Sequence, residues 1–413
     1  MVYALSHTNG SERGEVVRGR LESRTWRHDP ALYAPPRYRR ACAYDAFIPM
    51  GIAGFASPMS TEAAAVTAEA AAAIHLLNAR ARPALMPLAR LLLRTESIAS
   101  SKVEGLQVEA RDLARAEARV ETGGKAGPTA REVLANIDAM ELAIDEASSA
   151  SRVTVTDIAQ IHRALLASAP NSQLAGQVRS TQNWIGGNDY NPCAASFVPP
   201  PPEHVQSLLD DLCEAVNEDE LPPIVQAALV HAQFETIHPF ADGNGRTGRA
   251  LIHVVLRRRG LAPAYVPPIS VVLAANKDRY INGLTRFRND DVDGWLVDFA
   301  AAAAQGAQLA ESYLGAVERL QERWRRQVRD AMKPRSDAAV WRLIDVLPAH
   351  PVVTLPVAVA AIARTKAVVN QALDQLERAG VLARLSGGER NRSWEATGLL
   401  DLLTGLENGI SPH

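Results

Sequence analysis

Twelve consecutive residues, His238–Arg249, concentrate side chains that could do chemistry, and they read HPFADGNGRTGR. Gly243 and Gly245 allow the backbone to bend and to aim successive N–H groups at one anion. A helix expected to begin near Arg246 would add the positive end of its dipole. Arg246 and Arg249 lie three residues apart, about one helical turn, so both guanidinium groups can serve one polyphosphate.

Two more side chains of this stretch complete a reaction site. Asp242 offers a hard carboxylate at the edge of the loop, which suits Mg²⁺ shared with phosphate oxygens. His238, at the end of the preceding helix, can act as a general base at neutral pH. A base, a magnesium ligand, an anion cradle and two arginines together indicate phosphoryl or nucleotidyl transfer.

Simpler interpretations of the stretch fit less well. A solvated turn needs only one or two glycines. The residues from Gly243 to Gly248 match the GxGxxG pattern of dinucleotide-binding folds, but that pattern requires a preceding strand, and a helix is expected here. A P-loop is excluded because the stretch contains no Gly-Lys-Ser/Thr.

The elements that must position this loop are mostly helical. The spacing of apolar residues predicts helices on both sides of it, over 223–236 and 250–259. Further helices are expected over 60–93, 130–147, 155–167, 203–217, 270–288, 292–304 and 307–332. The segment 178–187 alternates as a β-hairpin does, and the proline run 199–202 ends it.

The stretch His238–Arg249 resembles, at every position, the signature of the Fic family of protein adenylyltransferases, His-Pro-Phe-x-Asp/Glu-Gly-Asn-Gly-Arg-x-x-Arg. The resemblance implies a mainly α fold, with a Fic-type helical core, a β-hairpin flap and a helical N-terminal extension. It also implies an ATP- and Mg²⁺-dependent enzyme. Such an enzyme transfers AMP to a Tyr, Ser or Thr hydroxyl of a target protein and of itself, and releases pyrophosphate.

The same resemblance assigns roles to single residues. His238 would deprotonate the target hydroxyl, and Asp242 would hold Mg²⁺. Asn244 and neighbouring amides would bind the α-phosphate, whereas Arg246 would contact the β-phosphate and Arg249 the γ-phosphate. The other residues expected to bind ATP are Gly243, Gly245, Thr247 and Gly248 of the loop, Ile185 and Gly186 of the flap, and Tyr280.

Two of these assignments keep an alternative. The segment around Ile185 and Gly186 would lie over the nucleotide and clamp the target protein by β-augmentation, but an ordinary surface hairpin has the same pattern. Tyr280 falls where the family places the adenine and ribose pocket, and a core tyrosine fits the sequence nearly as well.

A second motif, SSKVEG at Ser100–Gly105, matches the family's autoinhibitory pattern, Ser/Thr-x-x-x-Glu-Gly/Asn. The resemblance implies that Glu104 pairs with Arg249 and occupies the γ-phosphate position. ATP could then bind only in a pose that misaligns its α-phosphate. Two alternatives stay open: Glu104 caps or solvates a helix end, or it orients water for removal of AMP.

The chain divides into four predicted parts: an extended N-terminal arm (1–40), a helical extension with the inhibitory motif (41–125), the catalytic core (126–332) and a winged helix-turn-helix (335–400). The last prediction rests on three short helical patterns, over 337–346, 356–364 and 365–379, followed by a Gly-Gly hairpin. Its basic residues are offset by acidic ones, which favours a protein-binding or dimerisation module over a DNA-binding regulator. DNA binding stays open as the alternative for this module, and a homodimer is among the partners considered for the chain. For the catalytic core, phosphate transfer by the same fold stays open as the alternative.

The bulk composition fits an ordinary soluble protein of two or three domains, with 413 residues and a formal net charge of −2. No segment reads as a signal peptide or membrane span, so a cytoplasmic protein without a membrane partner is expected. Cys42, Cys193 and Cys213 are too few and too scattered for a disulfide framework, and reduced thiols are expected. His231 and His253 bracket the loop at a spacing that does not suit zinc, and each is expected to be buried and hydrogen-bonded.

Overall fold

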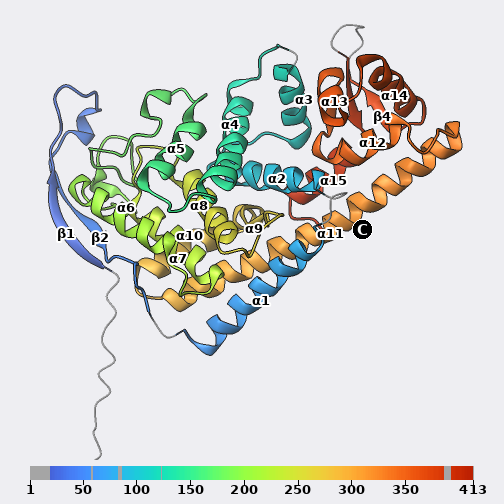
Figure 1. Cartoon of the computed structure of the whole chain (residues 1–413). Helices are drawn as coiled ribbons and strands as arrows, with labels where there is room; N and C mark the ends of the chain where they lie inside the picture. The colour runs from blue at the N-terminus through green and yellow to red at the C-terminus, as the bar shows by residue number, and fades with distance from the viewer. Residues whose placement is uncertain (1–18, 57–58, 82–85, 122, 386–391, 413) are drawn as a thin grey trace, which may run out of the picture.

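The computed structural model describes residues 19–56, 59–81, 86–121, 123–385 and 392–412, and this part of the chain is mainly helical (Figure 1), as predicted. The α-helices are α1 (Thr61–Ala79), α2 (Pro87–Val103), α3 (Ala110–Glu121), α4 (Pro128–Leu142), α5 (Val155–Leu166), α6 (Pro202–Asn217), α7 (Pro223–Ile237), α8 (Asn244–Arg258), α9 (Ile269–Ala275), α10 (Lys277–Arg288), α11 (Val292–Met332), α12 (Ala339–Val346), α13 (Leu355–Ile362), α14 (Lys366–Arg378) and α15 (Leu399–Glu407). The strands are β1 (Gly19–Trp26), β2 (Cys42–Pro49), β3 (Val352–Thr354), β4 (Leu382–Arg384) and β5 (Ser393–Ala396). Among the described residues, no helix combines the length and the apolar character that a membrane crossing requires.

Helices α7 and α8 lie at the centre of the core and lead into the candidate loop from both sides. Helix α7 carries apolar side chains on all of its sides, a pattern typical of a fully buried helix. Every residue from Ile224 to Ile237 is buried. In α8 every residue from Asn244 to Leu256 is buried as well. The helix begins at Asn244, slightly before the start near Arg246 that the loop predicts and six residues before the apolar pattern at 250, so the second half of the loop is helical.

Predicted helix boundaries are wrong at three further places, and at the first of them α2 continues past residue 93 to Val103. The sequence predicts a break near 305–306, but α11 runs continuously from Val292 to Met332 with α1 packed along it (Figure 1). Gly306 serves close packing there, because a Cβ at this position would lie 3.0 Å from the carbonyl oxygen of Pro268. Conversely, the single helix predicted over 270–288 is divided into α9 and α10 by Asn276, whose backbone is not helical (φ −128°, ψ 50°).

An antiparallel hairpin of β1 and β2 lies outside the helical core (Figure 1). The predicted N-terminal arm, 1–40, is described from residue 19 onward, and this part begins with strand β1, which is paired along its whole length with β2. The segment 178–187, predicted as a hairpin, is mostly irregular. Among the described residues it forms one isolated antiparallel bridge, between Ile185 and Phe197.

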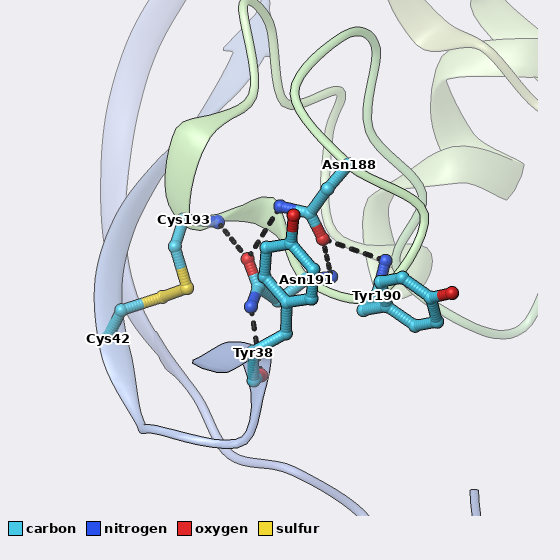
Figure 2. The surroundings of a disulfide bond; sticks show 6 residues. All are labelled: Tyr38, Cys42, Asn188, Tyr190, Asn191 and Cys193. Atoms are coloured by element: carbon cyan, nitrogen blue, oxygen red, sulfur yellow. Dashed lines mark hydrogen bonds between the residues drawn. A yellow bond between two sulfur atoms is a disulfide. The ribbon is translucent and has the colours of Figure 1, made fainter. Parts of the chain in front are cut away.

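Cys42 and Cys193 form a disulfide, so the prediction of reduced thiols is wrong for this pair (Figure 2). Their Cα atoms lie 5.9 Å apart although 151 residues separate them in the chain. Spacing along the sequence cannot reveal such a pair, because only the folded chain brings the start of β2 against this segment. The third cysteine, Cys213 on α6, is free and buried.

The C-terminal region packs α12, α13 and α14 with a sheet in the order β3-β5-β4. Helix α14, flanked by Thr365 and Ala379, coincides with a helix that the sequence predicts over 365–379. The winged helix as a whole stays a prediction, since the tip of its hairpin, 386–391, lies outside the described residues. Two helices that the sequence does not predict, α3 and α15, pack against each other, and α15 also contacts α2 and α11.

Candidate active site

His238 ends helix α7 in a left-handed backbone conformation (φ 49°), which is uncommon for a residue other than glycine. Its N–H donates to the carbonyl of Phe234 at 2.9 Å. Burial, with a further contribution from the charge of Arg179, lowers the pKa of His238 to about 4. The ring is therefore neutral at pH 7 and can accept a proton.

Two side chains of the flap segment fix the backbone of His238. Arg179 Nε donates to the His238 carbonyl at 2.9 Å, and Asn183 Nδ2 donates to the same oxygen at 3.1 Å. Arg179 also donates to the carbonyl of Pro200, at 2.6 Å, and is 6% exposed. The flap segment is thus joined to His238 by side chains and to the next residue, Pro239, by one backbone hydrogen bond, without a regular β-ladder.

The loop after His238 is closed by hydrogen bonds within itself and to α5. Asn244 Oδ1 accepts from the Phe240 N–H at 2.9 Å, and its Nδ2 donates to the Phe240 carbonyl at 2.8 Å. Its predicted contact with the α-phosphate stays a prediction, because the structure gives this side chain a loop-closing role. His162 bonds to the Asp242 carbonyl at 2.9 Å and stacks on Phe240.

The carboxylate of Asp242 is exposed at the edge of this loop. One oxygen accepts from the Gly243 N–H at 2.6 Å and the other from Asn171 Nδ2 at 2.7 Å. Each oxygen keeps a free lone pair, which suits a cation that takes most of its remaining ligands from phosphate and water. The predicted metal ligand is therefore sterically accessible beside the anion loop.

The first turn of α8 offers donors to an anion. Arg246 is 4% exposed, and within the described chain its Nε and Nη1 atoms have no hydrogen-bond partner. Thr247 Oγ1 is also buried without a partner. Buried donors are usually paired, so these atoms together with the helix N-terminus form a cradle that fits an anionic ligand.

Glu104 lies at this cradle. A Cβ added to Gly245 would collide with the Glu104 carboxylate, so the two are in close contact. Arg249 Nη2 donates to Glu104 Oε1 at 2.7 Å and to the carbonyl of Ser100 at 2.8 Å, while its Nε donates to Ser100 Oγ at 2.9 Å. The predicted inhibitory motif and the last arginine of the loop are thus in direct contact.

Electrostatics favour this ion pair. The side chain of Arg249 is 1% exposed, whereas that of Glu104 is 39% exposed. Burial opposes ionisation of Glu104, but the charge and the hydrogen bond of Arg249 outweigh it and hold its pKa below the ordinary value. A buried arginine needs an anionic partner, and in this structure Glu104 supplies it.

A buried polar cluster lies behind Arg249. Tyr280, 6% exposed, bonds through its hydroxyl to His231 Nε2 at 2.9 Å. Glu235 is buried in the same region, and burial raises its pKa to about 7. These contacts place Tyr280 in the core beside Arg249, and its adenine-pocket role stays a prediction.

The histidine predictions are confirmed. His231 is buried and bonded to Tyr280, and His253 Nε2 bonds to Glu96 Oε1 at 2.9 Å. In the described chain, the one group of three potential metal ligands is Glu22, Glu203 and His204, far from the loop in sequence.

The structure therefore brings His238, Asp242 and the cradle of α8 together with the inhibitory motif. Ile185, predicted to cover the nucleotide, is 37% exposed and donates its N–H to the Phe197 carbonyl at 2.8 Å; Gly186 follows with φ 75°. Arg179, Asn183 and Glu235 are missed by the sequence analysis. A charged residue and an amide inside a turn-rich segment were the available signal for the first two.

Comparison with known families matches two regions of the chain. Residues 152–256 match the model of the Fic/DOC family, and residues 64–145 match that of the Fic/DOC family N-terminal region. The first range contains His238 and the loop, and the second contains Ser100 and Glu104.

Curated relatives share the same central part. The chain is 34% identical to Protein adenylyltransferase fic-1 of Caenorhabditis elegans over 118 residues, which are 28% of this chain and 21% of that protein. It is 32% identical to Protein adenylyltransferase Fic of Drosophila grimshawi over 154 residues, 37% of this chain and 30% of that protein. The chain thus spans between a fifth and a third of the length of these relatives.

A solved structure shares the fold. A Fic family protein from Desulfovibrio desulfuricans G20 superposes with a TM-score of 0.51 at 19% identity, over 83% of this chain and 98% of that one. At this identity the likeness concerns the fold alone.

Proposed function

Because the chain belongs to the Fic/DOC family, we propose that it transfers AMP from ATP to a hydroxyl side chain of a protein, itself included, and that Glu104 inhibits this reaction. The observation that carries the proposal is the contact of Glu104 with Arg249 and with the first turn of α8. A carboxylate already occupies this cradle, so the cradle accepts anionic oxygen.

The residues present fit a nucleoside triphosphate with Mg²⁺. Arg246 has two buried nitrogen atoms without partners in the described chain, and Arg249 has an anionic partner that phosphate oxygens could replace. Asp242 would hold Mg²⁺, which would neutralise phosphate charge. The adenine and ribose of the nucleotide are proposed to bind on the side of Tyr280.

His238 is the proposed general base. The target oxygen forms a bond to the α-phosphorus while His238 accepts the hydroxyl proton, and the bond from that phosphorus to the pyrophosphate oxygen breaks. The neutral ring can take this proton at pH 7. Phosphate charge nearby would raise the pKa of His238 above its value in the free protein.

Inhibition follows from competition for one position. An ATP γ-phosphate and the Glu104 carboxylate cannot both accept from Arg249 Nη2. While Glu104 keeps this donor, the triphosphate binds displaced, and the α-phosphorus is out of line with the attacking oxygen.

The test is incubation with Mg²⁺ and ATP labelled at its α-phosphorus. We expect weak labelling of the wild-type protein, strong labelling of Glu104→Gly, and no labelling of Glu104→Gly combined with His238→Ala. ATP labelled at its γ-phosphorus serves as the control for phosphate transfer. Label from the γ-phosphorus alone, or a Glu104→Gly protein that binds ATP and stays unlabelled, would contradict the proposal.

A further inference from the structure

Helix α2, which carries the inhibitory motif at its end, lies on α8 in a register that a series of contacts defines. Three pairs of residues, one from each helix, are in contact: Glu96 with His253, Ser100 with Arg249, and Glu104 with Gly245. The residue numbers rise by four along α2 while they fall by four along α8, so the two helices are antiparallel. Four residues are about one helical turn, and the three contacts therefore lie on one face of each helix.

The contact farthest from the inhibitory residue belongs to a buried polar cluster around Glu96. The side chain of Glu96 is fully buried. Its Oε1 bonds to His253 Nε2 at 2.9 Å and accepts from Ser270 Oγ at 2.5 Å, whereas its Oε2 accepts from the Ser270 N–H at 2.8 Å. Because Ser270 belongs to α9, this one carboxyl group joins α2 to both α8 and α9.

Stability alone does not account for a carboxyl group at this place. Other side chains of the same helix, among them Leu92, Ile98 and Ala99, are buried and apolar. Taking a carboxyl group out of water is costly, and apolar side chains of similar size often give equal or greater stability. Directional hydrogen bonds to two neighbouring helices, however, are satisfied in one register only, as buried polar residues show in coiled coils.

Two other helices also bond to α2, but mostly through its backbone. Lys277 of α10 donates to the Val103 carbonyl at 2.6 Å, and Asn136 of α4 donates to the Ser97 carbonyl at 2.7 Å and to Ser101 Oγ at 3.0 Å. A carbonyl recurs at every residue of a helix, so bonds to carbonyls can re-form after the helix shifts. The bonds of Glu96 cannot, because it is the only acidic residue of α2.

We propose that Glu96 is a positioning residue of the inhibitory contact: it fixes the register of α2 on α8 and α9 and thereby holds Glu104 against Arg249. The inference rests on the proposed function and concerns the regulation of the same site. Glu96 precedes Glu104 by about two helical turns. A shift of α2 by one turn, about 5.4 Å, would break the 2.7 Å bond between Glu104 and Arg249 and leave this arginine to the triphosphate.

The experiment measures AMP incorporation from α-labelled ATP by the full chain with Glu96→Gln or Glu96→Leu. Gln keeps the size and one acceptor oxygen, whereas Leu removes every hydrogen-bonding group of the side chain. We expect labelling to rise about threefold in Glu96→Gln and about tenfold or more in Glu96→Leu, because the lost hydrogen bonds are buried. In the Glu104→Gly background neither change should affect labelling, since no inhibitory carboxylate remains to be positioned.

A second readout separates positioning from a merely structural role. The affinity for ATP, measured by calorimetry, should rise with Glu96→Leu when Glu104 is present and stay unchanged in the Glu104→Gly background. Damage to the fold would instead lower the affinity in both. Thr95→Val is the matched control, because Thr95 is equally buried on α2 and its hydroxyl donates to the Leu91 carbonyl of the same helix at 3.0 Å. This variant should label as weakly as the wild type.

The outcomes distinguish this inference from the proposed function. Labelling at or below the wild-type level in the folded Glu96 variants, or an increase that persists in the Glu104→Gly background, would overturn the role of Glu96 alone. Failure of both variants to fold would do the same, because Glu96 would then serve stability and not the register. A Glu104→Gly protein that binds ATP and stays unlabelled would overturn the proposed function, and the calorimetric comparison would still decide whether Glu96 controls access of ATP.

Discussion

At His238, two requirements of a general base oppose each other. Burial and the charge of Arg179 keep the ring neutral at pH 7, but a pKa of about 4 also makes it a weak proton acceptor. Its left-handed backbone is a strained conformation, which the hydrogen bonds from Arg179 and Asn183 to its carbonyl help to maintain. The fixed position of His238 thus compensates for the modest basicity of its ring.

We expect the pH dependence of AMP transfer to report this environment. His238 must be neutral to act, and its pKa lies below the ordinary 6.5, so kcat/KM should be retained as the pH falls through 6.5 and be lost only closer to 4. Arg179→Gln removes a charge that lowers this pKa and should move the acid limb to higher pH. Arg326→Gln is the control, and an acid limb unchanged by Arg179→Gln would exclude the electrostatic role.

Charge and shape can be separated at Glu104. Glu104→Gln keeps the side-chain size and a hydrogen bond to Arg249 but loses the ionic part, which makes such a bond about twice as strong. We expect AMP incorporation to increase from the wild type to Glu104→Gln and again to Glu104→Gly. The affinity for ATP, measured by calorimetry, should increase in the same order. Equal rates for Glu104→Gln and the wild type would show that bulk alone inhibits.

The residues of this site differ in how far the sequence predicts them. Glu104, His238 and Arg249 belong to contiguous motifs, so their types and spacing indicate both chemistry and proximity. Glu235 and Arg288 are single charged residues on helices, and such residues are usually solvated. Glu235 is three residues from His238 in the chain, so only its burial needs the fold to be seen. Arg288 comes within electrostatic range of His238 only in the folded chain.

At the scale of elements, the first turn of α8 depends on the absence of a side chain at Gly245. A Cβ there would collide with the Glu104 carboxylate and lie 3.0 Å from Arg249 Nη1. We expect Gly245→Ala, in the Glu104→Gly background, to weaken ATP binding at least about tenfold by narrowing the cradle. Gly315→Ala on α11, where a Cβ has ordinary contacts, is the calorimetric control. Unchanged affinity would place the triphosphate elsewhere.

The β1–β2 hairpin is held by a disulfide that the sequence does not predict. Replacing Cys42 and Cys193 together by Ser should speed amide hydrogen exchange in β1 and β2, because it removes the covalent link that holds the start of β2 against residue 193. Amides of α7 and α8 should keep their protection, since these buried helices pack mainly against each other and against other helices. Mass-spectrometric exchange measures both regions at once, and equal deprotection of core and hairpin would contradict this view.

The elements show where sequence reasoning ends. Apolar periodicity predicts α7 and α14 almost to the residue, because burial of their own side chains forms them. It fails at Asn276 and Gly306, where contacts with other elements decide whether a helix breaks. It also misses β1, which pairs with the next strand of the chain, and the disulfide, whose two cysteines are far apart in the sequence.

At the scale of the whole molecule, the C-terminal region supports the helix that carries the inhibitory motif. Helix α15 and the turn Leu347–Ala349 both pack against α2. Lys102, two residues before Glu104, donates to Asn408 Oδ1 at 3.3 Å, and Arg111 pairs with Asp401 of α15 at 3.0 Å. The position of Glu104 is therefore tied to a region that lies outside the catalytic helices.

This arrangement predicts that loosening α15 relieves inhibition. Leu403 is 2% exposed, and Leu403→Ala should cost about 2–5 kcal/mol of local packing, which allows α2 to move and Glu104 to leave Arg249. AMP incorporation should rise severalfold in Leu403→Ala, but not in Leu403→Ala combined with Glu104→Gly, where no inhibitor remains. Leu373→Ala creates a comparable cavity in α14, which packs mainly against α12, α13 and β4, and should leave labelling unchanged. Additive effects of Leu403→Ala and Glu104→Gly would mean that α15 acts on the site by a route that does not pass through Glu104.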